Sequence, residues 1–274
     1  MAIVTLTSDI GNQDFLIGAV KGQLLCMNSS FNLVDITHQL PPFNYSQAAY
    51  IIRNAVRNFP EFSFHIILAN LFDRIPEKLL LAVAGNQYIF CADNGLLSMI
   101  MEESPELVIG LHLMKEKGEK NLALCIAVIG KTIQDILDGK DLREIGETDT
   151  KYQEKNHLQP NLGDDWIEGQ IIFIDHFENV IVNITREQFE KQRHGRKFQI
   201  RFRRDEMIER ICESYADVPE GEKLALFNSG GYLEIAINKG NAAGLFGLQR
   251  YTEQSQNQYL QSRLLYQSIR VNFI

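Results

Sequence analysis

The chain has 274 residues, a length that suggests one large domain or two of moderate size. Hydrophobic residues make up 45% of it and charged residues 23%, which excludes a wholly disordered protein. Its 35 acidic and 27 basic residues give a net charge of −8, which argues against binding of nucleic acid by bulk electrostatic attraction.

The first half of the chain alternates short apolar runs, typical of strands, with segments whose apolar residues have helical spacing. Strands are predicted at residues 3–6, 33–36, 64–68, 79–84, 87–91 and 106–113. Helices are predicted at residues 15–27, 45–59, 95–103 and 122–137. Gly85-Asn86 joins two of the strands and is typical of a tight hairpin turn. The alternation predicts an N-terminal α/β domain over residues 1–150 with a mostly parallel sheet.

The second half of the chain has a different pattern, in which predicted short strands follow a polar segment. Residues 151–165 are polar, lack apolar periodicity and are predicted to form a linker. Short strands are then predicted at residues 169–173, 180–184, 197–203, 224–227 and 232–237, with one helix at 186–192. This pattern predicts a smaller, mostly antiparallel C-terminal β domain over residues 166–274, built as a barrel or a sandwich.

Membrane, metal and disulfide signals are weak throughout the chain. No run of about 18 apolar residues is present, and the N-terminus lacks a charged targeting region, so no membrane partner and a cytoplasmic location are expected. The four cysteines lie far apart in apolar stretches, with no histidine at ligand spacing. The four cysteines, Cys26, Cys91, Cys125 and Cys212, are therefore predicted to be buried free thiols. For the chain as a whole, no bound metal and no cofactor are predicted.

Two acidic residues follow the first predicted strand. Ligands of open α/β sheets bind beyond the carboxyl ends of strands, and Asp9 lies just past the first one. A carboxylate at that place can accept two hydrogen bonds from a ribose diol, but Ser8 or Asp9 can equally cap the next helix. Asp14, at the helix start, can likewise cap it or contact a ligand amine. The local sequence leaves these alternatives open.

Three turns carry polar residues that suit either a ligand or the turn itself. Asp93-Asn94-Gly95 lies between a strand and a helix, and residues 228–231 (NSGG) join two strands. Asp175 and Asn179, four residues apart, can present an acceptor and an amide to one polar ring edge. Asx-turn chemistry explains the same pair without a ligand. His176 beside Asp175 allows an acid–base pair or a purely structural role.

Four segments, taken in order, resemble the S-adenosylmethionine hydroxide adenosyltransferase family, the relatives of fluorinase and chlorinase. They are residues 7–11 (TSDIG), 93–97 (DNGLL), 169–184 with IDHFENV inside it, and 228–243 beginning NSGGYLEIAINKG. The resemblance covers nearly the whole chain, although residues 110–165 match weakly. It implies an N-terminal α/β domain, a C-terminal β-barrel and a homotrimer with sites between subunits.

The resemblance also implies roles for individual residues. Asp9 would hold the ribose hydroxyls, and Asp14 would hold the methionine end. Phe43 lies where the halogenating relatives have an aromatic residue against the ligand. Asp175 and Asn179 would serve the adenine or methionine end, with Ser229 on the same wall. The family reaction displaces the sulfonium from the ribose C5′ carbon of S-adenosylmethionine, and water or hydroxide as nucleophile gives adenosine and methionine. Catalysis then depends on in-line positioning and a desolvated nucleophile.

The sequence departs from the family where the hydrolytic members hold water with an Asp, an Arg and a His. Asn70 takes the place of the Asp, as a ligand-binding candidate, and Glu77 that of the Arg. With a gap in the alignment, Asp73 and Lys78 become surrogates for these two catalytic groups. The position of the His falls in residues 123–128, which contain none, and Glu178 replaces a Gly of the C-terminal signature. The departures leave two functions open, namely slow hydrolysis and non-catalytic binding of an adenosyl ligand.

Overall fold

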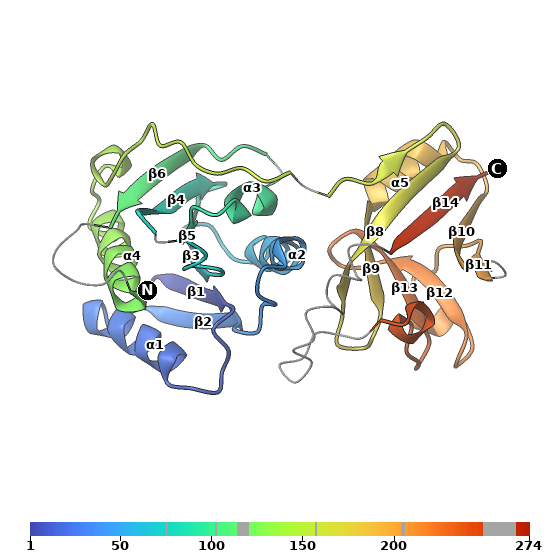
Figure 1. Cartoon of the computed structure of the whole chain (residues 1–274), viewed down its shortest axis with the longest axis horizontal. Coiled ribbons are helices and arrows are strands. Elements are labelled where there is room, and N and C mark those ends of the chain that lie inside the picture. Colours follow the sequence, from blue (N-terminus) through green and yellow to red (C-terminus); the bar gives the residue numbers. More distant parts are fainter. Residues whose placement is uncertain (75, 102, 114–120, 157, 204–205, 249–266) are drawn as a thin grey trace. The chain divides into compact units, whose positions relative to one another are not determined.

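The computed structural model describes residues 1–74, 76–101, 103–113, 121–156, 158–203, 206–248 and 267–274. The chain divides into two compact units, Met1–His157 and Leu158–Ile274 (Figure 1). Among the described residues, no helix combines the length and the apolar character that a membrane span requires.

The first unit is built on a sheet of six strands in the order β2-β1-β3-β5-β4-β6. Its strands are β1 (Ile3–Ser8), β2 (Asn32–Thr37), β3 (Phe64–Leu68), β4 (Lys78–Ala84), β5 (Gln87–Ala92) and β6 (Leu107–His112). The β1–β2, β1–β3 and β3–β5 pairs are parallel, whereas β4 runs antiparallel to both β5 and β6.

The sheet is therefore mixed, and the expectation of a mostly parallel sheet needs correction. The cause is the hairpin at Gly85 and Asn86, which have φ angles of 55° and 60°. Two consecutive residues with positive φ form the kind of two-residue turn that links antiparallel neighbours. The turn inserts β4 between β5 and β6 with its direction reversed.

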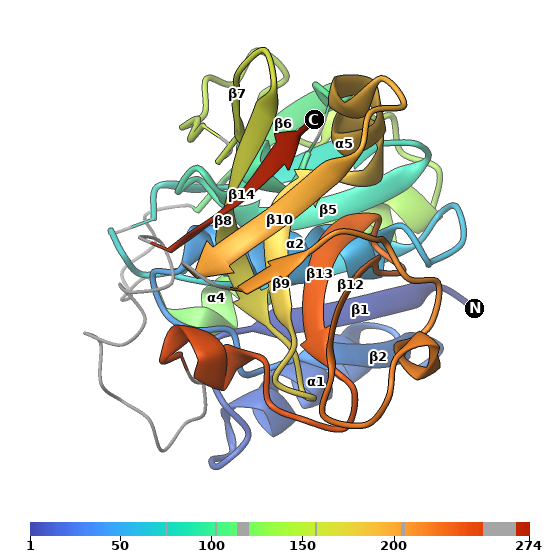
Figure 2. The same ribbon diagram turned by 90° about the vertical axis from the view of Figure 1, so that its right-hand side faces the viewer.

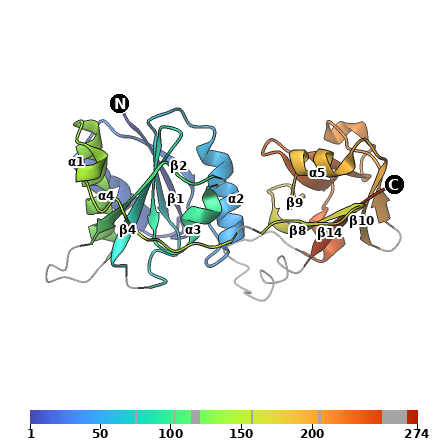
Figure 3. The same ribbon diagram turned by 90° about the horizontal axis from the view of Figure 1, so that it is seen from above.

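Helices cover both faces of this sheet (Figure 3). On one face, α1 (Leu16–Met27) and α4 (Leu122–Leu137) pack residues such as Leu24 and Ile129 against the strands. On the other face, α2 (Tyr45–Val56) and the short α3 (Leu96–Ile100) bury Ile52 and Leu97. Each helix matches a predicted one, although α3 ends at Ile100, where Met101 becomes extended.

The second unit is a nearly closed, barrel-like antiparallel sheet (Figure 2). Its strands are β7 (Asn161–Leu162), β8 (Trp166–Ile174), β9 (Val180–Thr185), β10 (Phe198–Arg203), β11 (Glu206–Ile208), β12 (Lys223–Phe227), β13 (Tyr232–Ile237) and β14 (Ser268–Phe273). Helix α5 (Arg186–Arg193) contributes Phe189, whose ring lies edge-on to three other phenylalanines of the core. The sequence had not indicated β7, β11 or β14.

Short 3-10 turns complete the described part of the chain, at Leu142–Glu144, Tyr215–Asp217 and Ala243–Phe246. The segment 151–165 contributes to both units. Gln153 donates hydrogen bonds to Asp93 in the first unit, whereas Leu162 pairs with β8 in the second.

Three of the four cysteines are buried free thiols, as predicted, but Cys26 is exposed. Helix α1 buries Ile17, Val20 and Leu24 against the sheet. Cys26 belongs to the apolar run of this helix, yet it lies outside the buried stripe, because only one face of a helix can reach the core.

A buried histidine gives the first unit a pH-dependent stability. His65 on β3 is 1% exposed, its Nδ1 lies 2.8 Å from Thr5 Oγ1, and its Nε2 has no hydrogen-bond partner among the described residues. Burial lowers the pKa of His65 from 6.5 to about 4. The unfolded chain therefore binds more protons than the folded one between these two values, and stability falls as the pH falls through this window.

We expect the wild-type protein to lose about 2 kcal/mol of unfolding free energy between pH 7 and pH 5 through His65 alone. In a His65→Leu variant this loss should disappear, because the side chain no longer titrates. Urea unfolding at both pH values measures it, with each variant compared only with itself. An equal loss of stability in both proteins would contradict the assignment.

Candidate functional site

The carboxyl ends of three neighbouring strands bring together polar loops of the first unit. Since β1, β3 and β5 are parallel neighbours, their ends meet at one edge of the sheet. Asp9 follows β1, Asn70 follows β3, and Asp93-Asn94-Gly95 follows β5. Residues that the sequence left as separate candidates therefore lie at one edge, the place where open α/β sheets bind ligands.

Asn70 connects these loops. Its backbone N–H donates to Asp9 Oδ2 over 2.7 Å, and its side-chain Oδ1 accepts from the backbone N–H of Phe43 over 2.9 Å. The Asn94 side chain in turn donates to the carbonyls of Ala69 and Asn70. Asn70 has a φ of 48°, a left-handed conformation that asparagine tolerates better than most residues.

Asp9 is a half-buried carboxylate bound to the loop after β3, and it does not cap helix α1. Helix α1 begins after Phe15 with no side-chain cap, so the interpretation of Ser8 or Asp9 as its cap is wrong. The exposed Asp14 instead accepts a hydrogen bond from the Leu16 N–H over 2.8 Å. Partial burial raises the pKa of Asp9, and the hydrogen bond from Asn70 opposes that rise.

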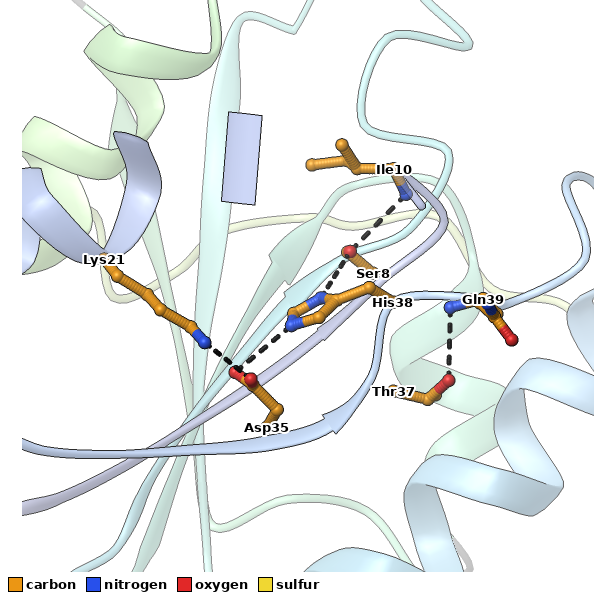
Figure 4. Close-up of polar contacts among 7 residues, drawn as sticks. All are labelled: Ser8, Ile10, Lys21, Asp35, Thr37, His38 and Gln39. Carbon is orange, nitrogen blue, oxygen red and sulfur yellow. Dashed lines mark hydrogen bonds and ion pairs between the residues drawn. The ribbon is translucent and has the colours of Figure 1, made fainter. Parts of the chain in front are cut away.

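A chain of polar side chains links Ser8, at the end of β1, with His38, Asp35 and Lys21 (Figure 4). Ser8 Oγ lies 2.8 Å from His38 Nδ1, and His38 Nε2 lies 3.1 Å from Asp35 Oδ1. Lys21 Nζ completes the chain at 2.5 Å from Asp35 Oδ2. Ser8 is fully buried and His38 is 3% exposed, so neither can reach a substrate.

The backbone reinforces the same connection. The Gly11 N–H donates to the His38 carbonyl over 2.7 Å, and the Leu40 N–H donates to the Ser8 carbonyl over 3.1 Å. These bonds tie the loop after β1 to the loop after β2. His38 therefore holds the chain on both sides of Asp9, and a histidine two residues after a predicted strand was the signal that sequence analysis overlooked.

We expect His38→Ala to weaken binding of an Asp9-held ligand about tenfold, because losing one buried hydrogen bond costs about 1.4 kcal/mol. The Lys21→Met variant is the matched control and should change the dissociation constant less than about twofold, since Lys21 reaches only the outer, exposed end of the chain. Calorimetric titration measures both. Equal effects of the two substitutions would show that His38 does not position Asp9.

Two hollows adjoin Asn70 in the first unit. The larger has a volume of about 480 Å³, within the range of small-molecule sites, and its walls include Asp9, Ile10, Phe43, Asn70, Phe72 and Asp73. The second, of about 310 Å³, is more polar and is lined by Asn70, Asp73, Arg74, Glu77, Lys78 and Asp93 among others. Asp73 and Lys78, the two predicted catalytic surrogates, thus face one cavity.

The surroundings of these two surrogates differ. Lys78 Nζ donates to the Lys151 carbonyl over 2.6 Å, so part of its hydrogen-bonding capacity is already used. Asp73 is exposed, and its backbone N–H donates to the Asn70 carbonyl, which fixes it next to the larger hollow. The sequence did not indicate Tyr45 and Lys155. The ammonium group of Lys155 lies over the Tyr45 ring, and the carboxylate of Asp73 acts to raise the pKa of both groups.

The second unit holds the remaining predicted residues at two turns. Asp175 Oδ1 accepts from the backbone N–H groups of Phe177 and Asn179, and Asp175 Oδ2 accepts from the Asn179 side chain. The Asx-turn interpretation of this pair is therefore correct. Ser229 is exposed at the tip of the β12–β13 turn, where Asn228 Oδ1 accepts from the N–H groups of Gly230 and Tyr232.

A hollow of about 350 Å³ lies beside the first of these turns and is lined by Phe177, Asn179, Tyr215, Ile237, Lys239 and Gly240. Beneath it, the Tyr215 hydroxyl donates to the buried Glu234 Oε1 over 2.6 Å. Burial raises the pKa of Glu234. The exposed Phe177 ring and the largely apolar walls suit a flat aromatic group.

The chain thus combines an α/β unit, which carries a carboxylate at the ends of its parallel strands, with a barrel-like antiparallel unit. The SAM hydroxide adenosyltransferase N-terminal domain matches residues 4–146, and the corresponding C-terminal domain matches residues 169–254. The chain belongs to the S-adenosylmethionine hydroxide adenosyltransferase family, as the sequence motifs indicated.

Relatives of known name are distant but span almost the full chain. An (R)-S-adenosyl-L-methionine hydrolase of Methanocaldococcus jannaschii is 24% identical over 92% of this chain and 94% of its own length. A protein of the same name from Thermus thermophilus is 24% identical over 91% of this chain and 97% of its own length. A fluorinase of Nocardia brasiliensis is 25% identical over 90% of this chain and 94% of its own length.

Solved structures share the fold. A conserved protein from Thermotoga maritima superposes with a TM-score of 0.77 at 21% identity, covering 99% of this chain and 100% of its own. A conserved protein from Thermus thermophilus gives a TM-score of 0.70 at 20% identity, with full coverage of both chains. At this level of identity the similarity establishes the architecture alone.

Proposed function

We propose that the protein cleaves S-adenosylmethionine at the ribose C5′ carbon with water, giving adenosine and methionine. The observation that carries the proposal is the placement of Asp9, a half-buried carboxylate at the end of β1 that opens onto a hollow of about 480 Å³. A carboxylate so placed can accept both hydroxyls of a ribose. Family membership and relatives named as hydrolases support the same chemistry.

Different residues of this chain would bind different parts of S-adenosylmethionine. Asp9 would hold the ribose, and Phe43 and the neighbouring apolar side chains of the hollow would exclude water. The exposed Asp14, which lies outside the walls of this hollow, would serve the methionine end. The sulfonium is already a good leaving group, so positioning and desolvation supply most of the acceleration. In the second unit, Asp175 and Asn179 shape the turn beside the apolar hollow that would take the adenine, with Ser229 at the neighbouring turn.

Non-catalytic binding of the same ligand is the second candidate function. It is favoured by the side chain of Asn70, which occupies the family position of an Asp and whose Oδ1 already accepts the Phe43 N–H. An amide cannot accept the proton of an attacking water. Asn70 would then be a structural part of a ligand-binding site.

Calorimetry with S-adenosylmethionine and adenosine, followed by chromatography of S-adenosylmethionine incubated with the protein, tests both functions. Binding together with adenosine formation supports the hydrolase. We expect turnover about 10²–10⁴-fold slower than in a relative with the full Asp, Arg and His set, the usual cost of misplaced acid–base groups. Binding without adenosine supports the binding protein, and no binding at millimolar ligand would reject both in favour of a non-enzymatic interaction module.

We further propose a homotrimer whose sites combine residues of different subunits. Support comes from the family resemblance and from the two sets of ligand-facing groups, around Asp9 in one unit and around Asn179 in the other. Light scattering should give three times the mass of the chain. A monomer that binds the ligand with full affinity would reject this assembly.

A further inference from the structure

Asn70 uses only half of its side-chain amide within the fold. The residue is 8% exposed, and its Oδ1 accepts from the backbone N–H of Phe43 over 2.9 Å. Its Nδ2 group donates to no residue in the described ranges of the chain. Since buried polar groups nearly always have a partner, in protein or in water, this open donor indicates a site for an additional molecule.

The bond to Phe43 fixes which end of the amide carries the hydrogens. A backbone N–H can only donate, so the side-chain atom that faces it is the oxygen, and the reversed amide would set two donors against each other. Both residues also have left-handed backbones, with φ angles of 48° at Asn70 and 62° at Phe43. Such conformations persist where the surrounding contacts determine them, so the amide is held in one orientation.

The open donor reaches the space beyond the strand ends. Asn70 lines both hollows described above, and Asp9 and Phe43 line the larger one with it. Nδ2 is not one of the polar atoms that the described part of the chain encloses without a hydrogen-bond partner. It therefore keeps access to the hollows and can donate to a ligand bound there.

The same residue is bound directly to Asp9. The backbone nitrogen of Asn70 lies 2.7 Å from Asp9 Oδ2, to which its N–H donates. Bond lengths place Nδ2 at most about 5 Å from the nitrogen of its own backbone, and hence within about 8 Å of that carboxylate oxygen. One hydroxyl that makes two hydrogen bonds spans up to about 6 Å, and two neighbouring hydroxyls span more. A ribose diol can therefore contact both side chains at once.

We infer that Nδ2 of Asn70 donates to a ribose hydroxyl whose hydrogen is donated to Asp9, an assignment that rests on the proposed binding of an adenosyl ligand. A hydroxyl has one hydrogen and two lone pairs. Once its hydrogen is donated to the carboxylate, its oxygen can only accept, and Asn70 supplies the donor. A ligand without this hydroxyl leaves a carboxylate and an amide unpaired, which is the arrangement by which sites reject such analogues. Asn70 is thus a specificity-determining residue for the intact ribose diol.

The test is calorimetric titration with adenosine, 2′-deoxyadenosine and 3′-deoxyadenosine, and the measured quantity is the ratio of the deoxy to the adenosine dissociation constant. Asn70→Asp keeps an acceptor for the Phe43 N–H and tolerates the left-handed backbone, but it replaces the donor with an acceptor. For one of the two deoxy ligands, we expect this ratio to be about tenfold smaller in the variant than in the wild-type protein, because adenosine loses one hydrogen bond and the analogue loses none.

A second variant separates the lost donor from the added charge. Asn70→Gly suits the left-handed backbone, adds no charge and should reduce the same ratio by a similar factor. The matched control is Asn86→Asp, the same substitution at an exposed left-handed asparagine in the β4–β5 turn. It should leave both ratios within about twofold of wild type, because exposed turn residues far from a ligand contribute little.

Ratios that stay at the wild-type value in both Asn70 variants, for both deoxy ligands, would overturn the assignment. Faster formation of adenosine from S-adenosylmethionine by Asn70→Asp with unchanged ratios would also overturn it, because the side chain would then face the nucleophile and not the ribose. A wild-type protein that binds neither adenosine nor S-adenosylmethionine would overturn the proposed function itself, and this assignment with it.

Discussion

The Asp9→Ala variant is expected to bind S-adenosylmethionine and adenosine at least about 100-fold more weakly than the wild-type protein. Each hydrogen bond to a charged group is worth about 1.5–3 kcal/mol, so losing the two that a ribose diol would make costs more than about 2.7 kcal/mol. The substitution also removes the acceptor of the Asn70 N–H. Both effects act on the same hollow.

Calorimetry on the purified protein measures the change. Asp149→Ala is the matched control, because it removes an exposed carboxylate of the first unit and should leave the dissociation constant within about twofold. A second variant, Asp9→Asn, keeps an acceptor for the Asn70 N–H and separates loss of charge from loss of loop structure. Unchanged affinity in Asp9→Ala would exclude this carboxylate from the binding site.

The Asp73→Asn variant is expected to lower kcat for adenosine formation about 10²–10³-fold, because an amide cannot accept the proton of the attacking water. Binding of S-adenosylmethionine should change little, since Asp73 is exposed at the margin of the larger hollow. Single-turnover chromatography separates the two effects. The expected result is a fall in kcat with a nearly constant KM.

Glu77→Gln provides the control for Asp73. This substitution neutralises another carboxylate of the same polar hollow and should leave kcat within a few-fold of wild type. Fast turnover that persists in Asp73→Asn would mean that the loop containing residues 70–78 is wrongly aligned with the family or that a different base is used. Equal losses in both variants would indicate a general electrostatic effect.

The extent of the sequence prediction differs between the two units. In the first unit every predicted helix and strand is present, because long apolar runs at clear spacing indicate their own secondary structure. The predicted Gly85-Asn86 hairpin is present, with β4 antiparallel to β5, but the prediction of a mostly parallel sheet was wrong. The position of a hairpin within a sheet depends on contacts distant in the chain, here the antiparallel pairing of β4 with β6. In the second unit, β14 was missed because the stability of an isolated short strand depends on the strands that flank it.

The candidate site shows the same division. Four motifs in order sufficed to indicate the family and to select Asp9, Asn179 and Ser229 as candidate ligand-binding residues. The residue types at the strand ends can be identified from the sequence alone. The sequence left open whether Asp9 caps a helix, and the structure decides against it through the bond to Asn70.

The sequence by itself determined the secondary structure of the first unit, most strands of the second, the family and the residues at the strand ends, because these follow from local spacing and motif order. Only the tertiary structure decided which of them meet. Ser8 and His38, 30 positions apart, are linked side chain to side chain, and Lys155 lies over the Tyr45 ring although these two residues are much farther apart in the chain. Contacts between residues so far apart leave no repeating pattern in the sequence. They form because the hydrophobic cores elsewhere in the unit stabilise the fold that brings the residues together.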